Sequence, residues 1–263
     1  MPERSAHLEI ARLWLAGRGL TDVPPTPWLA ARLTVRRRAR LAASTLVALF
    51  LCGVALIYVT ALPTGEPADE LRSLLVLMAL VVVLVLAQAL LDRWVRHVDR
   101  QASEQLPQRA AHTIRPGWRT VLGLPRAALL VTTYIAATTL AIGTLIVRDS
   151  TDRYPPVILL IGLCGVAIGT VIQLRHVLTH PVVADDEGSL AADLHMRVED
   201  ARELAMPTAV WSLPVVSVFS AGLDPWNTAW LVFIVLSIIA LLLITAWTGR
   251  STLAAARHAT SAR

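Results

Sequence analysis

The side chains best suited to chemistry in this chain gather in one short polar segment between two apolar runs. They are His180, Asp185, Asp186, Glu187, Asp193 and His195. Carboxylate oxygens and imidazoles can bind a divalent cation, but this spacing matches no EF-hand loop, zinc finger or HExxH motif. Consecutive acids just before a helix N-terminus are favourable without a metal. The sequence therefore predicts neither a metal site nor a cofactor. It predicts instead a surface for a cytoplasmic partner, formed by Asp185, Asp186, Glu187, Asp193 and Arg197.

Motifs of known enzyme classes are missing from the sequence. No GxSxG motif places a serine nucleophile, and no GxxxxGK[ST] loop is present to bind the phosphates of ATP. The apolar runs hold no pair of carboxylates for general acid–base catalysis. We therefore expect a non-enzymatic protein without catalytic residues. An enzyme working at the inner face through the acidic segment remains as a third interpretation.

The apolar runs that must position these side chains define the class of protein. None contains Asp, Glu, Arg or Lys, and together they cover residues 41–62, 73–91, 127–147, 156–174, 207–222 and 227–248. An α-helix crosses a bilayer core of about 30 Å with roughly 20 apolar residues. The sequence therefore predicts an all-α, polytopic integral membrane protein with six transmembrane helices within residues 41–248. The fifth run is the shortest, and Pro207 and Pro214 are expected to break it.

The distribution of arginine predicts the orientation of the spans. All 24 basic residues are arginine, and with 19 acidic residues they give the 263-residue chain a formal charge of +5. All but Arg72, Arg148 and Arg153 lie in the segments 1–40, 92–126, 175–206 and 249–263. Short cytoplasmic loops collect arginine, so we expect a multi-pass protein of the bacterial cytoplasmic membrane with both termini inside.

The two chain ends are expected to be cytoplasmic arms. Residues 1–40 are predicted to form an arginine-rich arm with an interfacial helix, and residues 249–263 a tail. The cluster that directly precedes the first span comprises Arg36, Arg37, Arg38 and Arg40. Such a cluster acts as a topology signal and contacts anionic lipid headgroups. The bilayer therefore explains the basicity of the chain, and nucleic acid is not an expected partner.

Small residues form the clearest pattern inside the spans. In the fourth span they are Gly162, Gly165 and Gly169, and in the third Thr132, Ala136, Thr139 and Gly143. Such stripes let helix backbones approach closely, where van der Waals contact replaces the hydrophobic drive that a membrane lacks. We therefore expect a compact bundle in which spans 1, 3 and 4 contribute close contacts. A substrate path along the threonines of the third span is the alternative interpretation.

Two further patterns bear on transport. An Arg-His pair follows each even-numbered span, which favours three tandem helical hairpins, although coincidence in an arginine-rich chain explains the same pattern. Repeats and broken helices recur in transporters. A proton-coupled transporter is disfavoured because the spans contain no ionisable relay, and their strongly polar side chains are Gln88 and Gln173 near the inner boundary.

The six-span layout and the segment from His180 to Leu194 resemble poorly characterised six-span integral membrane proteins of actinobacteria. That resemblance implies that the protein accompanies a transcriptional regulator or a transport system. It carries over no catalytic or binding residue to this sequence. The layout is more loosely similar to permease subunits of ABC exporters, from which the short loop Leu223–Trp226 departs.

Two functions follow from these observations. The first is a non-enzymatic subunit, scaffold or regulator that acts through its cytoplasmic arms. The second is a transport component, either a permease subunit that needs a cytoplasmic ATPase or a carrier of an amphiphilic small molecule. The sequence is compatible with a homo-oligomer in either case.

Overall fold

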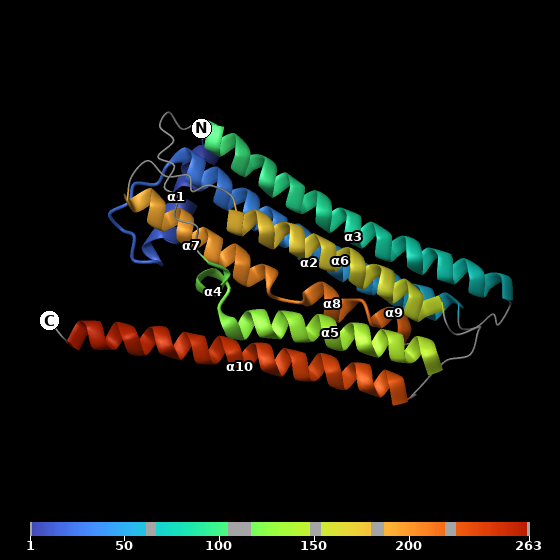
Figure 1. The fold of residues 1–263 in the computed structure, drawn as a ribbon. Helices are drawn as coiled ribbons and strands as arrows, with labels where there is room; N and C mark the ends of the chain where they lie inside the picture. The colour runs from blue at the N-terminus through green and yellow to red at the C-terminus, as the bar shows by residue number, and fades with distance from the viewer. Residues whose placement is uncertain are drawn as a thin grey trace.

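The structure, a computed structural model, describes residues 2–61, 67–104, 117–147, 154–179, 187–218 and 225–261. All regular secondary structure in these residues is helical, which confirms the all-α prediction (Figure 1). The long helices are α2 (Pro27–Ala61), α3 (Pro67–Glu104), α5 (Leu124–Val147), α6 (Tyr154–Thr179) and α10 (Pro225–Ser261). The shorter ones are α1 (Pro2–Ala16), α4 (Trp118–Val121), α7 (Glu187–Leu204), α8 (Thr208–Ser212) and α9 (Val215–Val218).

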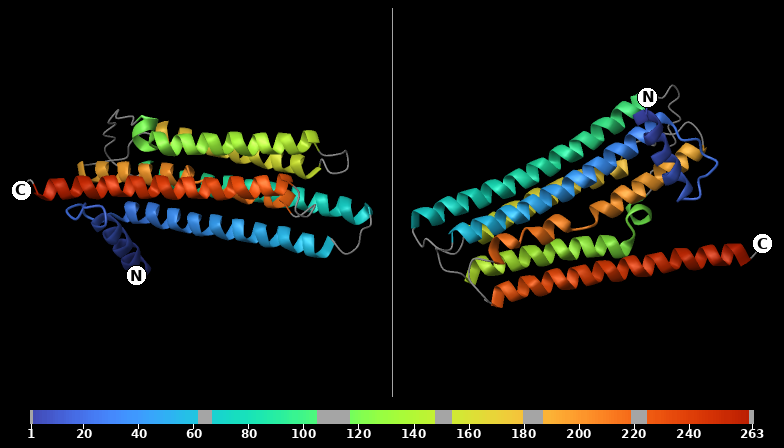
Figure 2. Two further views of the ribbon diagram at one scale, coloured as in Figure 1. Left: turned by 90° about the horizontal axis from the view of Figure 1, so that it is seen from below. Right: turned by 180° about the vertical axis from the view of Figure 1, so that it is seen from behind.

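Among the described residues, five helices are long and apolar enough to cross a membrane. They cover Pro27–Thr60, Leu71–Gln101, Leu124–Val147, Tyr154–Thr179 and Pro225–Trp247. The five run side by side as one elongated bundle (Figures 1 and 2). Their outer surface is apolar; for example, Leu56 is 64% exposed and Leu243 is 65% exposed. A surface of this kind suits hydrocarbon rather than water, so the chain has the build of a multi-pass membrane protein.

The fifth predicted span, residues 207–222, does not form one helix of spanning length in its described part. Helix α8 ends at Ser212, Leu213 and Pro214 form a turn, and α9 begins at Val215. The break at Pro214 is therefore confirmed; proline lacks an N–H group and its ring clashes with the preceding turn. Leu213 and Val216 are fully buried. The surrounding helices thus enclose this irregular backbone, as irregular backbone at membrane depth requires.

Close packing between the helices involves spans 1, 3 and 4. Helix α2 packs mainly on α3, and α6 packs on both α3 and α5. A Cβ atom added to Gly162 would lie 2.9 Å from Cγ1 of Val81, and one added to Gly165 would lie 2.7 Å from Cγ1 of Val85. These two glycines therefore allow α6 to approach α3. Spans 1, 3 and 4 thus each contribute close contacts, span 1 with span 2, span 3 with span 4, and span 4 with spans 2 and 3.

The small-residue stripe predicted for α5 is displaced by one position. The buried positions include Thr133, Ala137, Ala141 and Thr144, whereas Thr132 and Thr139 are exposed and Ala136 is half-buried. Gly143 does pack closely, because a Cβ atom there would lie 3.0 Å from the ring of Trp226. The two stripes have the same helical period. The sequence pattern therefore predicted the correct spacing but the wrong face of the helix. The exposed threonines form no path through the bundle.

One end of the bundle carries a helical cap, which we define as α1, residues 27–40 of α2, residues 92–101 of α3, and α7. Helices α2 and α3 extend beyond their predicted apolar spans to enter this cap. Its small apolar core includes Ala11, Leu15, Leu29 and Met196. The predicted interfacial helix α1 therefore packs against α2 and α7. Both chain ends lie at the cap end of the bundle (Figure 1).

Candidate functional site

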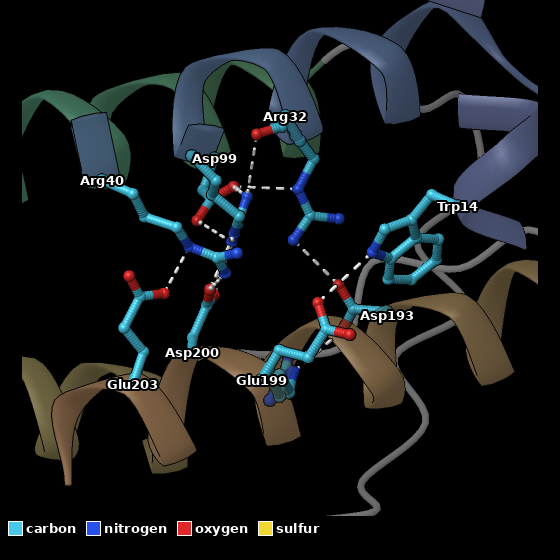
Figure 3. A network of polar contacts seen from close by, with 10 residues as sticks. Trp14, Arg32, Arg40, Asp99, Asp193, Glu199, Asp200 and Glu203 are labelled. Carbon is cyan, nitrogen blue, oxygen red and sulfur yellow. Dashed lines mark hydrogen bonds and ion pairs between the residues drawn. The ribbon is translucent and has the colours of Figure 1, made fainter. Parts of the chain in front are cut away.

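A network of buried ion pairs joins α2, α3 and α7 inside the cap (Figure 3). Arg32 donates from Nε to Oδ1 of Asp99 at 2.8 Å and from Nη2 to Oδ1 of Asp193 at 2.9 Å. Arg36 donates from Nη2 to Oδ2 of Asp99 at 2.8 Å and from Nε to Oδ2 of Asp200 at 2.9 Å. Arg32 and Arg36 are four residues apart and so share one face of α2. Asp99 from α3 lies between them and accepts from both.

The burial of these groups makes the network structurally important. Asp193 is fully buried, and Arg32, Arg36 and Asp99 are each no more than 8% exposed. Charges in such a place are stable only when they are paired and hydrogen-bonded. Arg197, one helical turn after Asp193 on α7, satisfies the remaining oxygen of Asp193 by donating from Nε at 2.8 Å. The network thus fixes α7 across the ends of α2 and α3.

Two further ion pairs, which are more exposed than the others, extend the network toward the cap surface. Arg40 pairs with Glu203, whose pKa is raised by burial while the charge of Arg40 opposes that rise. Arg18 pairs with Glu199 and stacks 3.9 Å from the ring centroid of Trp14. Both pairs are partly open to solvent, so they contribute less to stability than the buried pairs do.

The arginine cluster predicted to contact lipid headgroups is divided by the structure. Arg37 and Arg38 are exposed, whereas Arg36 is buried in the ion-pair network and cannot reach a headgroup. Arg40 is 44% exposed at its side chain but pairs with Glu203. This role of Arg36 is not apparent from the sequence, because its partners lie 63 and 164 residues away.

The predicted partner surface on the acidic segment is also revised. Asp193 and Arg197 are buried in the network, so they are not available to a protein partner. Asp185 and Asp186 lie outside the described residues, as does the side chain of Glu187. The sequence signal for the network was present in Arg32 and Arg36 at helical spacing. No sequence pattern linked Asp99 or Asp200 to these arginines.

A cavity of about 420 Å³ lies beside the network, between α2, α3, α5, α6, α7 and α8. This volume falls in the range of small-molecule binding sites, about 300–1,000 Å³. The part of the lining farthest from the cap is apolar and includes Val47, Val85, Val166 and Val210. Gly169 also lines it, and a Cβ atom added there would have no neighbour within 4 Å. Gly169 therefore faces open space, unlike Gly162 and Gly165.

A belt of polar side chains follows where the apolar spans end. It consists of Gln88, Asp92, Tyr134, Thr170 and Gln173. The hydroxyls of Tyr134 and Thr170 lie 3.1 Å apart, and Gln173 is hydrogen-bonded to Asp92. The two glutamines noted in the sequence therefore meet in one cavity, although they lie on α3 and α6. Beyond the belt, the cavity is lined by the ion-pair network itself, including Arg36 and Asp200.

Candidate metal ligands and the two cysteines also bear on the chemistry of the described residues. No group of three or more His, Cys, Asp or Glu residues in that part of the chain is placed to hold a metal ion. Cys52 and Cys164 are free and exposed on the outer surface of the bundle. The arrangement of the cavity can thus bind and orient a molecule through apolar contact, hydrogen bonds and charge.

Comparisons of the chain with protein families, with curated proteins and with solved structures return no match. The fold and the site therefore define the class by themselves. The chain is an all-helical protein of the multi-pass membrane type, with a helical cap at one end and a cavity that reaches from the cap into the bundle.

Proposed function

We propose that this protein binds an amphiphilic small molecule in the cavity, as a component of transport in the bacterial cytoplasmic membrane. The cavity lining carries the proposal, because it changes from apolar to polar along a single direction. The valines line the part that lies within the bundle, and the belt and ion pairs line the part toward the cap. An apolar tail and a polar head each find matching surroundings in this arrangement.

The broken α8–α9 segment gives independent support to a transport role. Val210 of α8 lines the cavity and is fully buried, and the turn at Pro214 follows directly. Discontinuous helices beside a binding site are a recurrent feature of transporters, because their broken ends present helix termini and free backbone groups to the substrate. A rearrangement of α8 relative to α6 would change access to the cavity.

In this proposal the chain crosses the membrane six times, with the broken segment 207–222 as the fifth crossing and both termini inside. The position of both chain ends at the cap supports it, as does the concentration of arginine there (Figure 1). Alkaline phosphatase fused after Asp69, Thr151 or Asp224 should be active, because the enzyme needs the periplasm or cell exterior. Fusions after Arg109 or Gly188 should be inactive. The opposite pattern would overturn the orientation.

Binding is tested by filling the cavity. Gly169→Phe places a ring in open space beside the valines, whereas Ile168→Phe adds a ring on the neighbouring position, which is 61% exposed on the outer surface. We expect wild-type protein in nanodiscs to bind radiolabelled single-chain amphiphiles. Gly169→Phe should weaken that binding about 10-fold or more, through loss of apolar burial, and Ile168→Phe should leave it unchanged. Equal binding by all three proteins, or none by the wild type, would refute the proposal.

The second candidate function is a subunit, scaffold or regulator that acts through the cytoplasmic arms. The exposed Arg37 and Arg38 on the cap favour it, because they remain available to a partner. Affinity purification of the tagged protein from native membranes separates the two functions. Stoichiometric recovery of a P-loop ATPase would indicate a permease subunit, and recovery of a cytoplasmic protein that is not an ATPase would favour the scaffold or regulator.

A further inference from the structure

We propose that the cavity selects amphiphiles with a compact zwitterionic head, whose ammonium group lies beside Asp92 and whose anionic group lies beside Arg96. This inference rests on the proposed function, since it assigns the ligand class of the same cavity. It follows from the charges that line the cavity, from the hydrogen-bonding groups around them, and from their depth along α3.

All but two of the carboxylates and arginines that line the cavity form ion pairs within 4 Å with other described residues. Four carboxylates line it, and three of them, Asp99, Asp200 and Glu203, form ion pairs with arginines of α2. Asp92 is the fourth, and no ion pair of the described residues within 4 Å includes it. The five arginines that line the cavity likewise include one residue outside these ion pairs. Four of them pair with carboxylates, and the fifth, Arg96, is in no ion pair within 4 Å among the residues that the structure describes.

The two remaining charges are placed to act together. Asp92 and Arg96 are four residues apart on α3, so they lie on one face of the helix. They are close enough for the charge of Arg96 to act on Asp92, yet the described ion pairs within 4 Å do not include this pair. Both side chains are half-buried and face the cavity. A molecule that carries both signs of charge can therefore contact both residues at once.

The neighbouring groups complete a polar site for such a head. Gln173 already binds Asp92 and helps to fix the carboxylate. Gln88 lies one turn before Asp92 on α3, and Tyr134 and Thr170 line the same cavity. These amide and hydroxyl groups can donate to and accept from a head without adding net charge.

The positions of the lining residues along the bundle place the tail of a bound amphiphile in the apolar part of the cavity. Asp92 is the first charged residue after the second apolar run, at the level where lipid headgroups begin. Val85 lies two turns deeper and lines the cavity beside Gly165. The head of a bound molecule therefore lies at the headgroup level and its tail points into the bundle. The cavity volume of about 420 Å³ fits a single chain with a compact head.

A head with only one sign of charge is a poorer fit. A cationic head would satisfy Asp92 and be repelled by Arg96, and an anionic head would have the reverse problem. A neutral head would leave both charges without an opposite charge in contact once the ligand has displaced water from them, which is costly. Selectivity of this kind comes from the groups that the wrong ligand leaves unpaired.

The test compares four amphiphiles with matched chains: lysophosphatidylethanolamine, an alkylamine, an alkyl phosphate and an alkyl maltoside. Equilibrium binding to the full-length protein is measured in nanodiscs of uncharged synthetic lipid. We expect the zwitterion to bind about 10-fold or more tightly than each of the others, as expected for hydrogen bonds to charged groups. Asp92→Asn should weaken binding of the zwitterion and the amine but not that of the phosphate. Arg96→Gln should weaken binding of the zwitterion and the phosphate but not that of the amine.

Controls separate this inference from the proposed function. Arg93→Gln changes an exposed charge on the same helix and should leave all four affinities unchanged. If all four amphiphiles bind equally to the wild type and none binds to Gly169→Phe, the cavity is the binding site but does not select zwitterionic heads. That result would support the proposed function and overturn this inference. Binding of none of them would overturn the proposed function itself. Unchanged preference for the zwitterion in both Asp92→Asn and Arg96→Gln would also overturn the inference.

Discussion

Asp99→Ala is expected to lower the free energy of unfolding by about 3–5 kcal/mol, the usual result of removing one partner from a buried ion pair. Asp99 accepts hydrogen bonds from both Arg32 and Arg36, which are buried beside it. Without this carboxylate, two guanidinium groups remain in a poorly solvated place with less negative charge than before. Unfolding by titration with a denaturing detergent, followed by circular dichroism, measures the change.

The matched control for this prediction is Asp22→Ala. Asp22 is exposed, and its carboxylate accepts a long hydrogen bond of 3.5 Å from the hydroxyl of Thr21. We expect its replacement to change the free energy of unfolding by less than about 0.5 kcal/mol. An equal effect of Asp22→Ala and Asp99→Ala would show that the buried network contributes no more than a surface charge does.

Gly162→Ala is expected to destabilise the bundle by about 1–3 kcal/mol, the range for overpacking a filled core. The added Cβ atom would lie 2.9 Å from Cγ1 of Val81 and 3.0 Å from Cδ2 of Leu213. Both neighbours are buried, and Val81 has little rotamer freedom because it is β-branched. Helix α6 must therefore move away from α3 or from the α8–α9 turn. The same detergent titration measures the loss.

Gly169→Ala makes the identical change on the same helix, where the new Cβ atom meets nothing within 4 Å. Alanine has a higher helix propensity than glycine, so this variant should be as stable as the wild type or up to about 1 kcal/mol more stable. The pair thus separates close packing from helix propensity. Equal destabilisation by both substitutions would show that close contact of α6 with α3 is not the reason for Gly162.

The cap and the cavity are linked through shared residues. Arg36 and Asp200 belong to the ion-pair network and also line the cavity. The network therefore positions one wall of the cavity while it holds α7 in place. A loss of stability in Asp99→Ala should for this reason be accompanied by weaker binding of amphiphiles.

The sequence by itself determined the class of protein and much of its secondary structure. Long uncharged runs require helices, because a backbone in hydrocarbon must satisfy its own hydrogen bonds. Five of the six predicted spans coincide with helices of spanning length. The break at Pro214 and the pair of Asp193 with Arg197 were predictable as well, since each depends on residues at most a few positions apart.

Tertiary structure alone decided which charges are buried and where the cavity lies. The hydrogen bond from Arg36 to Asp200 joins residues 164 positions apart. From the sequence alone, several other acidic residues were equally plausible partners for Arg36. The sequence also left open which face of α5 is buried. The stripe of small residues that includes Thr132 and the one that includes Thr133 have the same helical period. Local patterns report the period and the polarity of a helix. The neighbours of each helix face depend on the packing of all the helices together.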